Sequence, residues 1–188
     1  MTFEPILMIW DFYDGPKTGL AIYKDNPHYF ECLFNVKHDE YHETFVLSPV
    51  DEAFLRVATT QWKIYREWEF NFHTGLVKLD THPGHGNVNS EYDQLENELK
   101  KLTGQLIQIQ NEFIPEFREV PNQDELPNGV LRELEATWRE VHLKIYNTNS
   151  AIRACPLDPG WRSHNRVLNW RCLCAIRHGY SQAGRRYI

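Results

Sequence analysis

Two aspartates three residues apart are the first side chains in the sequence that could do chemistry. Asp11 and Asp14 stand among aromatic residues in the segment W-D-F-Y-D-G-P, residues 10–16. Two carboxylates at this spacing could bind a cation or act as acid and base, and the aromatic walls would raise one pKa by desolvation. The pattern favours a simpler interpretation, in which D-G-P is a turn. Trp10 and Phe12 would then face the core, and Asp11 would face solvent.

A second set of candidates lies where a strand and a helix are expected to meet. His28 and Glu31 fall in the apolar segment 28–34, which is typical of a strand, and Glu67 and Glu69 fall late in the longest helical pattern. A glutamate that faced the strand would need a polar partner such as His28 or Arg66. Such a pair would mark a ligand pocket between sheet and helix. The alternative is that both glutamates lie on the solvated face of the helix.

Histidines offer two further candidate sites, neither with the spacing of a known metal site. His73, His82 and His85 follow the long helical pattern, and two of them lie in a Gly/Pro-rich loop. They could serve a metal or a general base, but only one nearby acid could add to the four ligands that zinc needs. His38 and His42 enclose a glutamate that falls one position late for H-E-x-x-H. We therefore predict ligand-binding roles at most for His73 and His82, no metal site and no cofactor.

The longest helical pattern is expected to organise the fold. Large apolar side chains from Phe54 to Phe72 recur at steps of three and four, which predicts one buried helical face. Pro49 suits the first turn and Gly75 suits the end, so the helix is predicted at 49–74. A second, shorter apolar stripe predicts another helix at 90–103.

Short apolar segments separated by turn residues predict the sheet. Four of them fall within the first 47 residues and indicate an antiparallel meander. Two more strands are predicted at 112–120 and 130–141, although the second pattern also fits a helix. We expect an α+β fold, in which an antiparallel sheet of about four to six strands is covered on one face by the 49–74 helix, with the 90–103 helix beside it.

Composition predicts one domain followed by a C-terminal segment of different composition. The chain has 188 residues, of which 41% are apolar, and it changes character near residue 146. We predict an α+β domain at 1–146 and a peripheral basic tail at 147–188. Residues 145–188 carry seven arginines and one acid, whereas the preceding residues carry 13 basic and 25 acidic side chains. The tail's cysteines and histidines lack the spacing of a zinc finger.

Cysteine usage and hydropathy predict the compartment. Four unevenly placed cysteines are too few for a disulfide scaffold of this length. No run of 18 apolar residues and no secretory leader is apparent, so we expect a cytoplasmic protein without a membrane partner.

Four segments of the chain resemble a group of uncharacterised bacterial proteins. They are W-D-F-Y-D-G-P-K-T-G-L-A at 10–21, P-H-Y-F-E-C-x-F at 27–34, F-V-L-S-P-V-D at 45–51 and W-K-I-Y-R-E-W-E-F-N-F-H at 62–73. The resemblance spans residues 6–83, and more loosely 127–141, without reaching the tail. No activity is assigned to that group, so the resemblance implies a soluble bacterial protein and carries no function.

Three functional hypotheses follow from the sequence. The first is a small acidic binding module that masks a basic protein partner, as immunity proteins do, because the body is acidic and catalytic motifs are absent. The alternative is an enzyme or small-molecule binder with a carboxylate and histidine pocket between the sheet and the long helix. A third is nucleic-acid contact through the basic tail, since the acidic body would repel nucleic acid.

Overall fold

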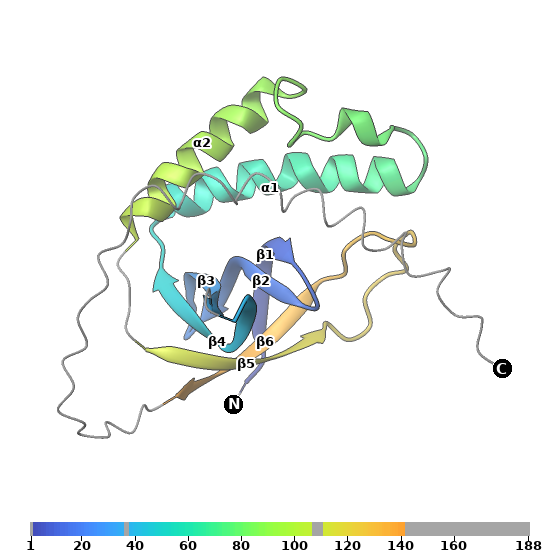
Figure 1. The fold of residues 1–188 in the computed structure, drawn as a ribbon. Helices are drawn as coiled ribbons and strands as arrows, with labels where there is room; N and C mark the ends of the chain where they lie inside the picture. Colours follow the sequence, from blue (N-terminus) through green and yellow to red (C-terminus); the bar gives the residue numbers. More distant parts are fainter. Residues whose placement is uncertain (1, 36–37, 107–110, 142–188) are drawn as a thin grey trace.

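In the computed structural model, six antiparallel strands form a closed barrel, and two helices lie on its outside (Figure 1). The structure describes residues 2–35, 38–106 and 111–141. The strands are β1 (Glu4–Phe12), β2 (Pro16–Tyr23), β3 (Asn26–Asn35), β4 (Glu40–Pro49), β5 (Glu112–Glu119) and β6 (Leu134–Val141). The helices are α1 (Glu52–His73) and α2 (Ser90–Gln105), with the short 3₁₀ helix η1 (Leu79–Thr81) between them.

The expected α+β fold is confirmed, and its sheet closes on itself. Each strand pairs with the next along the chain, and β6 returns to β1, where Glu4 pairs with Ala136. The ambiguous 130–141 pattern is a strand, because β6 pairs with β5 along its whole length, from Leu134 to Val141. Closure gives every strand of the described sheet a partner on each side, which limits edge-to-edge association, although β1 with β6 and β4 with β5 share only short contacts. No helix in the described part of the chain is long and apolar enough to cross a membrane.

The helix ends differ from the predicted ones by a few residues. α1 begins after Asp51, whose carboxylate accepts a 2.8 Å hydrogen bond from the backbone nitrogen of Phe54. Pro49 instead ends β4, where it pairs with His28, so strand pairing prevails over the helix-start preference of proline. α2 continues through Gly104 to Gln105, and its cap is Asn89. The predicted boundary at 146 and the tail 147–188 lie outside the described residues.

The barrel wall packs apolar side chains on both of its faces. Inside, the ring of Phe30 lies 5.7 Å from that of Trp138, within a cluster of aromatic residues. Outside, Met8, Leu20 and Tyr29 pack against Phe54 and its neighbours on α1. Each large side chain buried in this way contributes about 1.5–3 kcal/mol to stability. Burial on both faces explains why α1 must lie across the barrel.

Bulges in β1 change which side its residues face. Ile9 pairs with Gly19 and Asp11 pairs with Thr18, so two residues of β1 oppose one of β2 at this point. A bulge of this kind breaks the strict alternation of side chains and re-aims them. It sets the direction of Trp10 and Asp11, which begin the cleft described next.

Candidate functional site

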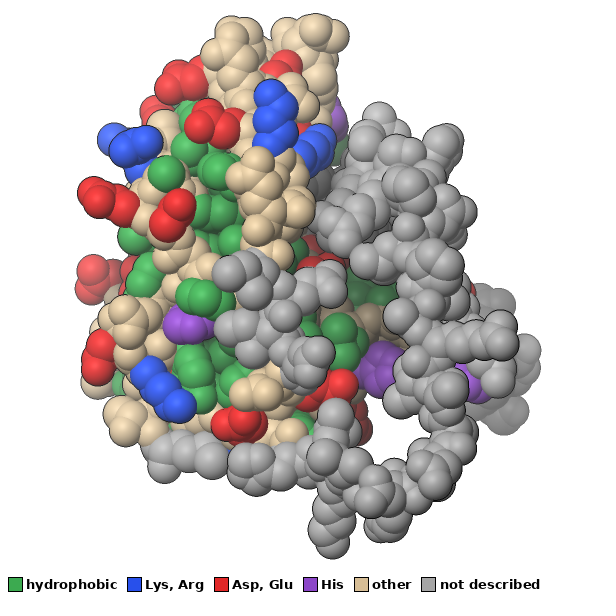
Figure 2. Space-filling model, turned by 90° about the vertical axis from the view of Figure 1, so that its left-hand side faces the viewer, with side chains coloured by type: hydrophobic (Ala, Val, Ile, Leu, Met, Phe, Trp, Pro, Cys, Tyr) green, Lys and Arg blue, Asp and Glu red, His purple; other side chains and the backbone are tan. Residues whose placement is uncertain are grey.

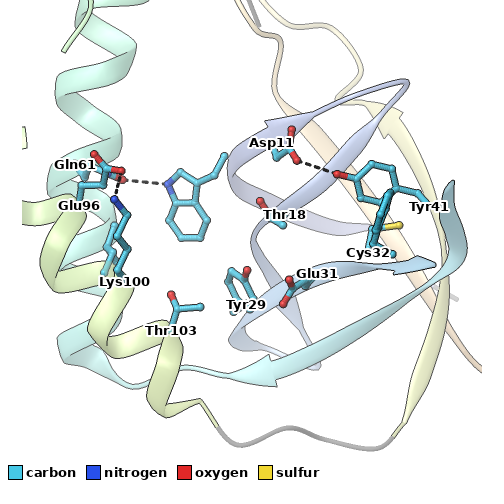
Figure 3. Close-up of a pocket in the computed structure, with 13 residues that line it drawn as sticks. Asp11, Thr18, Tyr29, Glu31, Cys32, Tyr41, Gln61, Glu96, Lys100 and Thr103 are labelled. Carbon is cyan, nitrogen blue, oxygen red and sulfur yellow. Dashed lines mark hydrogen bonds and ion pairs between the residues drawn. The ribbon is translucent and has the colours of Figure 1, made fainter. Parts of the chain in front are cut away.

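A cleft of about 260 Å³ lies between the barrel and α2 (Figure 3). Strands β1 to β4 supply its floor, Gln61 of α1 closes one side, and α2 supplies the opposite wall. The wall from α2 consists of Glu96, Leu99, Lys100 and Thr103, which recur at steps of three and four and so share one helical face. Elements far apart in the sequence therefore converge on a single space.

Trp10 forms the apolar end of the cleft. Its indole Nε1 donates a 3.2 Å hydrogen bond to Oε1 of Gln61, which is only 2% exposed. Its ring centre lies 6.1 Å from that of Tyr29 and 6.4 Å from that of Phe54. These contacts fix the indole between sheet and helix. Because of the bulge in β1, the next residue, Asp11, lines the same cleft.

Asp11, Cys32 and Tyr41 form the polar end. The Tyr41 hydroxyl donates a 3.4 Å hydrogen bond to Oδ2 of Asp11. Burial, reinforced by the negative charge of Asp11, raises the pKa of Tyr41 to about 12. The Cys32 thiol donates to the carbonyl oxygen of His42 at 3.2 Å, and burial raises its pKa. Both groups therefore stay protonated at neutral pH, and Cys32 is a thiol rather than a reactive thiolate.

Carboxylates outnumber cations around the cleft. Asp11, Glu31 and Glu96 line it, and Lys100 is its one basic lining residue in the described chain. Lys100 forms an ion pair with Glu96 one turn earlier on α2, at 2.6 Å. A second ammonium, that of Lys17, lies 4.9 Å from the centre of the Tyr41 ring. The cleft thus offers hydrogen-bond acceptors and negative charge beside aromatic surface.

Among the acids and histidines predicted as site residues, the structure brings Asp11 and Glu31 together in the cleft. Asp14 lies apart, exposed in the turn between β1 and β2 with φ 49°, as its D-G-P context predicts. His28 packs its ring edge-on against Tyr23 at 5.4 Å, and its Nδ1 donates to the carbonyl oxygen of Asn26 at 2.9 Å. His28 therefore faces neither the cleft nor the glutamates of α1.

Glu67 and Glu69 have different environments. Glu67 is exposed, whereas Glu69 is 5% exposed. Glu69 forms an ion pair with Arg66 at 2.5 Å and accepts a 3.2 Å hydrogen bond from the backbone nitrogen of Leu131. Arg66 also donates to the carbonyl oxygen of Leu131 at 2.8 Å. This pair fastens the segment before β6 to α1, so its role is structural.

His82 and His73 also support the fold away from the cleft. The ring of His82 lies 4.2 Å from that of Trp68, and its Nδ1 accepts a 2.9 Å hydrogen bond from the backbone nitrogen of Gly84. Burial, with a smaller contribution from nearby His85, lowers the pKa of His82 to about 4. His73 lies so close to Gly129 that any larger residue there would clash with the imidazole. In the ranges that the structure describes, no three His, Cys, Asp or Glu side chains group to hold a metal.

The cleft also contains residues that the sequence prediction missed, chiefly Gln61, Tyr41 and Thr103. Only Gln61 could have been recognised from the sequence pattern. It stands between Val57 and Tyr65 at steps of four, a polar residue inside an otherwise apolar helical stripe. No sequence pattern indicated Tyr41 or Thr103 as site residues, because their positions depend on the closure of the barrel and on where α2 docks.

Comparisons of this chain with models of known protein families, with curated proteins and with solved structures found no match in any of the three. The geometry of the cleft is therefore the basis for a functional argument.

Proposed function

We propose that this protein binds a small organic molecule in the cleft between the barrel and α2. The observation that carries the proposal is a cavity of about 260 Å³ on which four strands and two helices converge. Ligand sites are concave, mostly apolar, and contain a few polar groups that orient the ligand. Their usual volume is about 300–1,000 Å³, and this cavity of about 260 Å³ lies just below that range, so it suits a small metabolite.

The lining groups support a ligand with both flat apolar and polar parts. Trp10, Tyr29 and Leu99 present apolar surface, while Thr18 and Thr103 bring hydroxyl groups from opposite walls. A hydroxyl both donates and accepts hydrogen bonds, so this pair can orient a polar ligand from two sides. The indole of Trp10 is already fixed by Gln61, which lowers the entropy lost on binding.

The protonation states of the cleft support binding over catalysis. A nucleophilic mechanism needs a thiolate or a hydroxyl next to a base, and a raised pKa works against both. Burial keeps the Cys32 thiol protonated, and its proton is directed to the carbonyl oxygen of His42. The Tyr41 hydroxyl is held by Asp11 with a pKa of about 12. These groups are suited to hydrogen bonding.

A fragment screen by NMR tests the proposal. We expect small polar aromatic fragments to shift the indole N–H signal of Trp10 in a saturable way. Thr103→Trp fills the cleft and should weaken the binding of those fragments at least tenfold. Asn97→Trp is the matched control, because Asn97 is exposed on the same helix and does not line the cleft. The proposal is rejected if no fragment shifts Trp10, or if Thr103→Trp leaves binding unchanged.

A second candidate function is binding of a basic protein, favoured by charge. The described residues carry 25 acidic and 11 basic side chains. On the side of the molecule that carries α2, carboxylates border a zone of hydrophobic side chains (Figure 2). Such a complex would weaken steeply as salt rises, because exposed charges are screened. Thr103→Trp would leave it intact, which separates this candidate from a cleft ligand.

Nucleic-acid contact through residues 147–188 stays a prediction, since that segment lies outside the described residues. Deleting it and measuring the affinity for nucleic acid would test the idea, because lost phosphate contacts reduce both affinity and its salt dependence.

A further inference from the structure

We infer that the Tyr41 end of the cleft is a cation subsite, selective for a ligand with an amine or quaternary ammonium group, which would compete with the Lys17 ammonium for the Tyr41 ring. This inference rests on the proposed binding function and adds the chemical class of the ligand. Three observations carry it: a group of aromatic rings, adjacent carboxylates, and a cation of the protein already in place.

Two further aromatic rings lie beside Tyr41, and one of them, that of Phe34, also lines the cleft. The ring of Phe34 stands edge-on to Tyr41 at 5.0 Å, and the ring of Tyr13 lies 6.4 Å from it. Phe34 is 40% exposed and Tyr13 is 57% exposed, so both rings present surface to solvent instead of filling the core. Faces of exposed aromatic rings attract cations through the ring quadrupole, and groups of such rings recognise quaternary ammonium ligands.

The carboxylates supply the charge that complements a cation. Asp11 accepts the hydrogen bond of Tyr41, and Glu31 lines the same end of the cleft. Both come from the sheet, whereas Lys100, the basic lining residue, stands across the cleft on α2 and is paired with Glu96 (Figure 3). The sheet side of the cleft therefore favours positive charge.

The Tyr41 ring already holds one cation, the ammonium of Lys17, a residue that does not itself line the cleft. Its Nζ lies 4.9 Å from the centre of the Tyr41 ring, inside the range of about 6 Å for this interaction. Lys17 also lowers the pKa of Cys32, which opposes the effect of burial and indicates that its charge reaches the cleft. A ligand cation would compete with this ammonium for the Tyr41 ring.

Lys24 provides a matched control within the same protein. Its Nζ also lies 4.9 Å from an aromatic ring, that of Tyr23, but Tyr23 does not line the cleft, whereas Tyr41 does. Replacing either lysine by methionine removes one positive charge and one ring contact. A specific subsite should respond to Lys17→Met alone.

The test compares choline with 3,3-dimethylbutan-1-ol, a neutral molecule of almost the same shape. We expect choline to shift signals of the cleft in a saturable way, with an affinity at least tenfold above that of the alcohol. Lys17→Met should raise the affinity for choline about threefold or more, and Lys24→Met should leave it unchanged. Tyr41→Phe keeps the ring and should preserve binding, whereas Tyr41→Leu should weaken it about threefold or more.

The outcomes separate this inference from the proposed function. Equal binding of choline and the alcohol would mean recognition by shape, and would overturn the cation subsite while the cleft remains a binding site. Absence of choline binding to both the unmodified protein and Lys17→Met would overturn it as well. The same response to Lys17→Met and Lys24→Met would indicate a general charge effect and count against it. The fragment screen decides the proposed function independently, since its probes need no charge.

Discussion

The indole Nε1 of Trp10 on β1 donates a hydrogen bond to Oε1 of Gln61 on α1, at 3.2 Å and across 51 positions of the chain. This bond joins the barrel to the helix that covers it, and it lies at the wall of the cleft. The same contact therefore contributes to the stability of the fold and to the shape of the candidate site.

Replacing Gln61 by leucine should destabilise the fold by about 1 kcal/mol, because the Trp10 N–H loses its protein acceptor while the cleft can still admit water. Leucine has a similar volume, so the loss reflects the hydrogen bond more than packing. Chemical denaturation of the two proteins measures the difference. In a Trp10→Phe background the same substitution should cost much less. Equal costs in both backgrounds would show that the bond contributes nothing.

The ion pair of Glu69 and Arg66 should contribute more to stability than the Trp10–Gln61 hydrogen bond, because Glu69 is 5% exposed and also accepts a hydrogen bond from the backbone of Leu131. Glu69→Leu leaves the guanidinium and the Leu131 N–H without this acceptor. We expect the free energy of unfolding to fall by about 2–3 kcal/mol. This loss is smaller than that for a fully buried ion pair, because Arg66 reaches solvent. Denaturant unfolding measures it. Glu67→Gln, an exposed neighbour on the same helix, should change stability by no more than about 0.5 kcal/mol.

Local patterns were sufficient to predict most of the fold. The four early strands, the two later strands at 112–120 and 130–141 and both helices follow from apolar spacing and turn residues, and the structure has all of them. Barrel closure did not follow from these signals. It depends on two short contacts between distant strands, such as Glu4 with Ala136 and Phe45 with Phe113. Nothing in either segment alone specifies its partner.

The site was harder to predict because its residues depend on irregular geometry. A regular strand would place Trp10 and Asp11 on opposite faces, and the bulge opposite Thr18 is what brings both to the cleft. Glu69 was expected to pair with Arg66 or His28 or to face solvent. It does pair with Arg66, but it also accepts a hydrogen bond from the backbone of Leu131, a residue with no polar side chain. A hydrogen bond to a backbone group cannot be predicted from residue types, because almost every residue has the same backbone donor and acceptor.

Gly19 should be intolerant of any side chain. A Cβ at this position would overlap the carbonyl oxygen of Met8 and the ring of Phe30, both fixed in the barrel wall. We expect Gly19→Ala to lower stability by at least about 1–3 kcal/mol, the usual cost of overpacking a core. Thermal unfolding measures it. Gly104→Ala on α2 has open space around it and should be neutral or stabilising, by up to about 1 kcal/mol. A tolerated Gly19→Ala would contradict the close approach of these strands.

Acid should destabilise the protein partly through His82. Its pKa is about 4 in the folded protein, below the value of about 6.5 expected for an unfolded chain. The unfolded state therefore binds more protons between these values, so stability falls as the pH drops from about 6.5 to about 4. The contribution of this one group is at most about 3 kcal/mol. Urea unfolding at a series of pH values measures it.

The control for this prediction must remove the titrating group and keep its hydrogen bond. His82→Asn places an amide oxygen near the Nδ1 position, where it can still accept from the Gly84 nitrogen. Carboxylates titrate in the same pH range in both proteins, so the informative quantity is the difference between the two stability curves. That difference should change between about pH 6.5 and 4 in the direction of relative stabilisation of His82→Asn. The stability curve of His42→Asn, a substitution at an exposed position, should parallel that of the unmodified protein. Parallel curves for His82→Asn would mean that a neutral, buried His82 does not govern acid stability.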